Sequence, residues 1–206
     1  MNDVKIKICG LSRYEDIAYV NKVQADYAGF VVFYPKSVRH VEIDKAQQLI
    51  EYVDPGIKTV AVTVNPGMKQ LRAIENAGFN VLQVHGELGE DILETCRLPI
   101  FRAFNIDQAE TCQNVERHDK IIGYVFDGKT SGSGKTFDWH LIDTFDRAGK
   151  LLILAGGLNE ANVAQGIESV KPDIVDVSSG VEGIDGWKSG DKIIAFTESV
   201  RKKGIS

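Results

Sequence analysis

The chain has 206 residues, 43% of them hydrophobic and 26% charged, and its formal net charge is −5. This composition predicts a water-soluble globular protein, and it argues against the basic face that a nucleic-acid-binding surface needs. No apolar run approaches the roughly 18 residues of a membrane helix, and the first residues lack the long apolar region of a signal peptide. We therefore expect a cytoplasmic protein that binds neither nucleic acid nor a membrane.

Eight short apolar runs rich in Val and Ile recur along the chain, each separated from the next by a longer amphipathic segment. The runs are residues 4–9, 27–33, 58–64, 80–84, 99–104, 120–126, 150–155 and 173–178. Apolar runs without clean alternation suit strands that are buried on both faces of a parallel sheet. Eight units of about 26 residues predict a single (β/α)8 TIM barrel over residues 1–206. A doubly wound open sheet is the alternative.

The segments between the runs are predicted to be helices. Their predicted starts are Ser12 with Glu15 three residues on, the pair Asn65-Pro66, Asn159, and about Lys192. The first of these resembles a capping box, and the second places a cap residue before a proline at the first helical position. The last helix carries basic residues at its carboxyl end, where they suit the helix dipole.

The cysteines and histidines predict neither disulfides nor a metal site. The three cysteines form no CxxC pair and no zinc-ligand pattern; they are Cys9, Cys96 and Cys112. An odd number of irregularly spaced cysteines favours reduced thiols in the cytosol. The histidines also lack metal-ligand spacing, which disfavours a metal-dependent epimerase.

The active site of a (β/α)8 barrel is built at the carboxyl ends of its strands. The first run ends at Cys9, before Gly10. Its thiol is either a small buried hydrophobic group or a reactive group at the barrel mouth. Because side chains alternate along a strand, Lys7 points inward whenever Cys9 does. A cation there needs a carboxylate partner, for which Asp127 and Asp176 are the candidates.

Asp127 ends the sixth run and precedes a Gly- and Ser-rich segment, GKTSGSGKTFDW at 128–139. It could cap a helix, but Asp138 is better placed for that, so Asp127 is a candidate proton donor. The segment has the glycine spacing of neither a P-loop nor a dinucleotide-binding fingerprint. We therefore expect it to be a lid over the site.

Glycines and serines follow the seventh and eighth runs as Gly156-Gly157 and Ser179-Gly180. Bare backbone N–H groups after these two strands are the usual phosphate site of this fold. A tight turn would explain the double glycine equally well. The second pair, one unit later, favours phosphate binding.

Arg39 and His85 also follow predicted strands. Either could be an ordinary surface or structural residue. At the barrel mouth, Arg39 could instead hold a carboxylate through two parallel hydrogen bonds, and His85 could orient a ring or a hydroxyl group.

Together these motifs resemble those of the phosphoribosylanthranilate isomerases, in order and through essentially the whole chain. The matching segments are KICG at 7–10, FYPKSVRHV at 33–41, QVHGE at 83–87, FDG…GSGKTFDW at 126–139, LAGGLNEANV at 154–163 and VDVSSGVE at 175–182. The resemblance implies the Amadori rearrangement of N-(5-phosphoribosyl)anthranilate to 1-(o-carboxyphenylamino)-1-deoxyribulose 5-phosphate, a step of tryptophan biosynthesis. No cofactor is expected.

The resemblance also implies roles for single residues. Cys9 corresponds to the general base and Asp127 to the general acid. The residues implied to contact the substrate are Arg39, His85 and Asp176, and those implied to hold its phosphate are Gly156, Gly157, Ser179 and Gly180. We place Lys7, the predicted inward cation, with the substrate-binding residues.

Two other functions are compatible with a phosphate-binding barrel. An enzyme like indole-glycerol-phosphate synthase would need a catalytic Lys and Glu set on the strands, and no matching arrangement is found. A non-catalytic phosphosugar-binding barrel would have no use for both Cys9 and Asp127. The only partner we expect is a small-molecule substrate, and we expect a monomer rather than a dimer.

Overall fold

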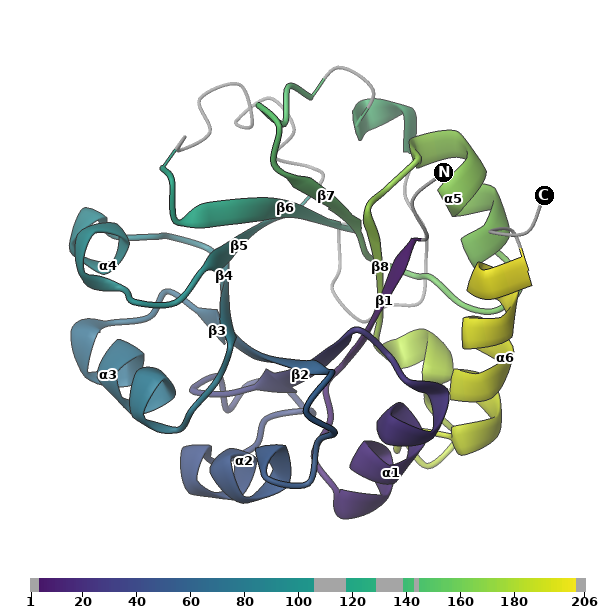
Figure 1. Ribbon diagram of the computed structural model, residues 1–206, viewed down its shortest axis with the longest axis horizontal. Coiled ribbons are helices and arrows are strands. Elements are labelled where there is room, and N and C mark those ends of the chain that lie inside the picture. The colour runs from purple at the N-terminus through teal and green to yellow at the C-terminus, as the bar shows by residue number, and fades with distance from the viewer. Residues whose placement is uncertain (1–3, 106–117, 129–138, 143–144, 203–206) are drawn as a thin grey trace.

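Eight parallel strands close into a barrel in chain order, β1 to β8, with helices around the outside (Figure 1). The computed structural model describes residues 4–105, 118–128, 139–142 and 145–202. The closed ring confirms the predicted (β/α)8 barrel and excludes the doubly wound open sheet, because β1 pairs with β8.

The strands lie within two residues of the predicted bounds. They are β1 (Lys5–Cys9), β2 (Tyr27–Val31), β3 (Lys58–Val64), β4 (Val81–His85), β5 (Ile100–Asn105), β6 (Ile121–Asp127), β7 (Leu151–Leu154) and β8 (Ile174–Val177). The described helices are α1 (Tyr14–Val23), α2 (Ile43–Ile50), α3 (Met68–Asn76), α4 (Glu90–Thr95), α5 (Val163–Val170) and α6 (Gly190–Arg201), with 3-10 turns η3 (Trp139–Ile142) and η4 (Ser179–Val181). None of these helices is long and apolar enough to cross a membrane.

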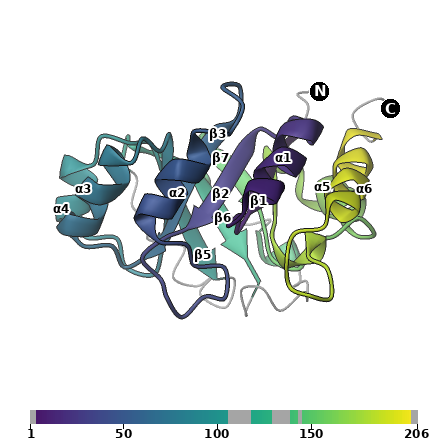
Figure 2. The same cartoon turned by 90° about the horizontal axis from the view of Figure 1, so that it is seen from below.

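Alternation along the strands divides the apolar residues between two cores. One core fills the barrel, and its members include Tyr27, Val60, Val62, Val81, Phe101, Val125, Ile153 and Ile174. The other lies between the strands and the surrounding helices, which stand outside the strands in the side view of Figure 2. Burial on both faces explains why the strand sequences are apolar without a period of two.

The predicted start of the first helix is wrong in detail. The N-cap of α1 is Arg13, not Ser12, and the carboxylate that closes it belongs to Asp16, not Glu15. Asp16 Oδ2 accepts hydrogen bonds from the backbone N–H groups of Ser12 at 2.9 Å and Arg13 at 3.0 Å. Its Oδ1 accepts from Arg13 Nε and Nη2. One buried carboxylate thus satisfies the donors that the capping box was expected to satisfy.

Three other helix starts differ from the predictions. Asn65 does not cap α3, which begins three residues later; its φ is +48°, and its Oδ1 accepts from the Glu87 N–H instead. Asn159 forms a turn, because its Oδ1 accepts from the N–H groups two and three residues on, and α5 begins after that turn. The last helix, α6, begins at Gly190, two residues earlier than predicted.

We expect Asp16→Ala to lower the free energy of unfolding by about 1–3 kcal/mol, since it leaves backbone N–H groups and an arginine without their acceptor. Glu15→Ala, an exposed neighbour on the same turn, is the matched control and should change stability by less than about 0.5 kcal/mol. Urea unfolding followed by circular dichroism measures both. A larger effect for Glu15 would restore the capping-box interpretation.

Candidate active site

A cavity of about 680 Å³ opens at the carboxyl ends of the strands. Most of the predicted site residues line it: Cys9, Arg39, His85, Asp127, Gly156, Gly157, Asp176 and Ser179. Lys7 and Gly180 do not belong to the lining. Residues 129–138 of the predicted lid, which include Asp138, lie outside the described part of the chain, and so does Cys112. The two described cysteines, Cys9 and Cys96, are free thiols.

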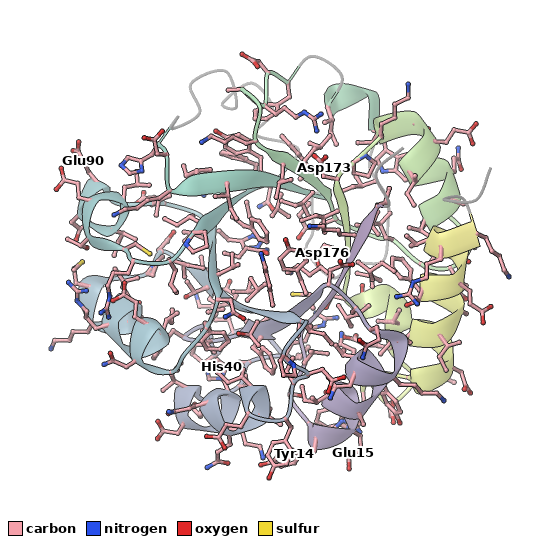
Figure 3. The ribbon with its side chains drawn as sticks, in the orientation of Figure 1. Tyr14, Glu15, His40, Glu90, Asp173 and Asp176 are labelled. Atoms are coloured by element: carbon pink, nitrogen blue, oxygen red, sulfur yellow. The ribbon has the colours of Figure 1, made fainter. Side chains whose placement is uncertain are left out.

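The period of two along a strand brings the reactive groups together. Val125 and Ile174 lie in the core inside the barrel, so Asp127 and Asp176, each two residues further along, point to the same interior. Figure 3 shows Asp176 directed into the barrel. Cys9, Asp127 and Asp176 are therefore the last inward-pointing residues of β1, β6 and β8, and their side chains line the cavity.

Lys7 lies behind Cys9 and Asp176, fully buried. Its Nζ donates to Asp176 Oδ2 at 2.6 Å, and the two residues are register partners in β1 and β8. Of the two predicted carboxylate partners, Asp176 is the one in contact. Burial lowers the pKa of Lys7, but attraction by Asp176 and Cys9 outweighs it, so the pKa of Lys7 lies above its ordinary value. Contact between Lys7 and a substrate stays a prediction.

Cys9 lines the cavity next to this buried cation. A Cβ on Gly29, the register partner of Cys9 in β2, would lie 2.9 Å from Cys9 Sγ and 3.2 Å from Lys7 Nζ. Only glycine leaves room there for both groups. Burial raises the pKa of the Cys9 thiol, and the positive charges of Lys7 and Lys188 oppose that rise.

Asp127 ends β6 beside the turn that follows β7. A Cβ on Gly156 would lie 2.8 Å from Asp127 Oδ1 and 2.2 Å from the Gly128 nitrogen, and Gly156 has a φ of +80°. Position 156 therefore requires glycine for two reasons: the positive φ, and the close approach of the Asp127 carboxylate.

The predicted phosphate loops meet on the same side of the cavity. Gly157, like its neighbour, has a positive φ of 69°, which turns the chain sharply after β7. A Cβ on Gly180 would lie 1.9 Å from the Leu158 carbonyl oxygen, so Gly180 allows the loop after β8 to pack on the loop after β7. Ser179 begins η4 at the cavity wall. Turned glycines of this kind expose backbone N–H groups that suit an anion.

His85 and Gln83 form a polar wall on β4. Burial, followed by the positive charges of Lys7 and Arg102, lowers the pKa of His85 to about 4, so the imidazole is neutral at physiological pH. Gln83 Nε2 donates to His85 Nε2 at 3.0 Å. Gln83 Oε1 and Asp176 Oδ1 are buried without a hydrogen-bond partner in the described part of the chain. Gln83 was not singled out from the sequence, although its spacing of two from His85 implies a shared face.

Arg39 is held by Glu182, which in turn binds Lys188; the sequence analysis singled out neither Glu182 nor Lys188. Arg39 Nε and Nη2 donate to Glu182 Oε1 and Oε2 at 2.5 and 2.8 Å. Lys188 Nζ donates to Glu182 Oε1 at 2.8 Å and to the Ser178 carbonyl at 3.0 Å. Arg39 thus makes two parallel hydrogen bonds to a carboxylate of the protein itself. Its binding of a substrate carboxylate stays a prediction.

This geometry can be compared with known proteins. Residues 6–199 match the family model for N-(5'-phosphoribosyl)anthranilate (PRA) isomerase. The chain belongs to this family. A PRA isomerase from Thermoanaerobacter sp. (strain X514) is 41% identical over 204 residues, which cover 96% of this chain and 98% of that protein. These findings confirm the resemblance found in the motifs, and they disfavour a synthase-like or non-catalytic barrel.

Solved structures of PRA isomerases have the same fold as this chain. The monomers generated from a dimeric enzyme of Thermotoga maritima are 34% identical, with a TM-score of 0.80 over 97% of this chain and 99% of that one. Another PRA isomerase, in complex with reduced 1-(o-carboxyphenylamino)-1-deoxyribulose 5-phosphate, is 32% identical, with a TM-score of 0.80 and the same coverage. Because the Thermotoga protein is dimeric, a monomeric state for this chain stays a prediction.

Proposed function

We propose that this protein isomerises N-(5'-phosphoribosyl)anthranilate to 1-(o-carboxyphenylamino)-1-deoxyribulose 5-phosphate, with Cys9 as base and Asp127 as acid. The observation that supports it is the placement of a thiol and a carboxylate on one cavity, from two different strands. Because β1 and β6 are three positions apart in the closed ring of strands, the two groups can flank a bound sugar ring, as a rearrangement with two separate proton transfers requires.

The reaction needs one proton delivered and one removed. Protonation of the furanose oxygen by Asp127 lets the bond between that oxygen and C1' break, while the anilino nitrogen forms a double bond to C1'. Cys9, as thiolate, then takes the proton from C2', and the electrons of that bond move to the iminium. The enolamine that results tautomerises to the aminoketose. Atoms and electrons balance without any redox partner.

The remaining cavity residues are suited to orient an anionic sugar. We place the phosphate against the loops of Gly156, Gly157, Ser179 and Gly180. Asp176 Oδ1 and Gln83 Oε1, both buried acceptors without partners among the described residues, can accept hydrogen bonds from sugar hydroxyls. His85 adds a ring without net charge to the cavity wall.

A fluorescence assay tests the proposal directly. Purified protein should accelerate the loss of phosphoribosylanthranilate fluorescence, with the aminoketose as product by mass-resolved chromatography. Release of free anthranilate instead of the aminoketose, or no acceleration, would contradict the proposed function.

Arg39→Ala should raise KM by about 10- to 100-fold with a smaller effect on kcat, because charge-assisted hydrogen bonds to the anthranilate carboxylate contribute about 1.5–3 kcal/mol. Arg97→Ala, an exposed arginine that pairs with Glu75 outside the cavity, is the matched control and should leave both constants unchanged. Steady-state kinetics of the two variants measure the difference. An unchanged KM for Arg39→Ala would remove Arg39 from the binding site.

A further inference from the structure

The hydrogen bonds of Arg39 use only one side of its guanidinium group. Glu182 accepts from Nε and Nη2, the side-on pair of donors. Nη1 donates to no residue in the part of the chain that the structure describes, and Arg39 lines the cavity. A guanidinium carries five N–H donors, so the end-on pair at Nη1 and Nη2 is left for a second planar acceptor.

Both ends of the Arg39 side chain are fixed. Its aliphatic stem lies against Gly10, where an added Cβ would come within 2.5 Å of Arg39 Cδ. Its charged head is clamped by Glu182, which is only 12% exposed. Lys188, 2% exposed, donates to the same Glu182 Oε1 and to the Ser178 carbonyl, and so fixes Glu182 to the loop after β8. The side-on contact between Arg39 and Glu182 therefore differs from an exposed surface ion pair, because both of its side chains are largely buried and held by neighbours.

We propose that Glu182 is a positioning residue for substrate recognition: it holds Arg39 side-on so that the end-on donors face the anthranilate carboxylate. This inference rests on the proposed function. A carboxylate that competed with the substrate would occupy the end-on edge, and Glu182 does not. The ion pairs of this cluster join two cations, Arg39 and Lys188, to the one carboxylate of Glu182.

Lys188 and Arg39 together keep Glu182 ionised. Burial raises the pKa of Glu182, but hydrogen bonds from Arg39 and attraction by Lys188 outweigh this and lower it below its ordinary value. Glu182 therefore stays ionised at neutral pH. Without it, the charges of Arg39 and Lys188 would face each other, and the guanidinium would move away from the buried lysine. The guanidinium of Arg39 would keep its charge, but its end-on donors would no longer face the anthranilate carboxylate.

The test compares two ligands on the Glu182→Gln variant by titration calorimetry. One is reduced 1-(o-carboxyphenylamino)-1-deoxyribulose 5-phosphate, and the other is the same compound without the carboxyl group. We expect the first to bind about tenfold more weakly than to the wild type, as when one charge-assisted contact is misaligned. The second should change by less than about twofold. In kinetics the loss should fall mainly on KM.

Matched variants separate the possible results. Glu90→Gln, on α4 across the barrel from α6 (Figures 1 and 3), should leave both affinities unchanged. Arg39→Lys keeps the charge but offers no second pair of donors, so it should also lose affinity only for the carboxylate ligand. If Glu182→Gln does not fold, Glu182→Asp takes its place: it keeps the charge beside Lys188 but shortens the reach to Arg39, so it should show the same selective loss. Equal losses for both ligands, or no loss for either, would overturn the inference.

The proposed function can fail independently. It fails if the wild type does not form the aminoketose. If the wild type is active and Arg39→Lys distinguishes the two ligands, but Glu182→Gln does not, only the role of Glu182 is wrong.

Discussion

Cys9→Ala is expected to lower kcat by roughly 10²–10⁴-fold, the usual contribution of a positioned proton-transfer group. The variant removes the base that takes the C2' proton, whereas the groups proposed to hold the phosphate and the carboxylate stay in place. Affinity for reduced 1-(o-carboxyphenylamino)-1-deoxyribulose 5-phosphate should therefore change by less than about threefold. Single-turnover fluorescence and calorimetry on the same preparation measure the two quantities.

Cys96→Ala is the matched control for this prediction. Cys96 is also a buried, free thiol, but it lies in the core between strands and helices, where its Sγ donates to the Leu98 carbonyl. Cys96→Ala also removes a buried thiol sulfur, but from the core outside the barrel, so kcat should be unchanged. Wild-type turnover in Cys9→Ala, or equal losses in both variants, would exclude Cys9 as the base.

The pH dependence of the wild type follows from the same group. A base is active when deprotonated, and burial raises the pKa of Cys9 above its ordinary value. The rate at which iodoacetamide alkylates Cys9, which reports the thiolate alone, should accordingly keep rising with pH through the range where an ordinary thiol has already ionised. Lys7→Met should shift this rise to still higher pH, because it removes a positive charge that favours the thiolate. A rise completed below neutral pH would contradict the raised pKa of Cys9.

The strand ends account for how much of the site could be predicted. Cys9, Asp127 and Asp176 are the last inward-pointing residues of β1, β6 and β8. The alternation of side chains along a strand predicts this from the sequence, without knowledge of any contact. Lys7 was found by the same alternation. Its burial then required a carboxylate, and the register of β1 against β8 decided for Asp176.

Glu182 and Lys188 show where this reasoning ends. The contact between Arg39 and Glu182 joins residues 143 positions apart. Both lie in loops, so no periodicity indicates where their side chains point. The only available signal was chemical: an arginine placed at the barrel mouth can pair with an acid in a neighbouring loop.

The helix starts failed for a different reason. Ser12-x-x-Glu15 and Asn65-Pro66 fit local capping rules, but each donor or acceptor had a stronger partner within reach. Asp16 satisfies the backbone of Ser12 from within the same turn, and the amide oxygen of Asn65 binds Glu87 in the next loop. Capping rules describe an isolated helix, whereas loops at the barrel mouth compete for the same polar groups.

Asp127→Asn should lower kcat by roughly 10²–10⁴-fold as well, but by blocking a different step. The amide keeps the shape of the carboxyl group, so the close contact with Gly156 is preserved, and it cannot protonate the furanose oxygen. Asp119→Asn is the control: Asp119 is exposed just before β6, at the opposite end of the same strand. That variant should have wild-type kcat.

An isotope effect distinguishes the acid from the base. In Asp127→Asn, opening of the ring becomes rate-limiting, so a substrate with deuterium at C2' should react at nearly the same rate as the unlabelled one. A substrate supplied as the already opened imine would bypass the missing acid and recover turnover, whereas Cys9→Ala would gain nothing from it. A full primary isotope effect in Asp127→Asn, or no recovery with the opened substrate, would mean that Asp127 acts after ring opening. The acid would then have to be sought among the other groups on the cavity.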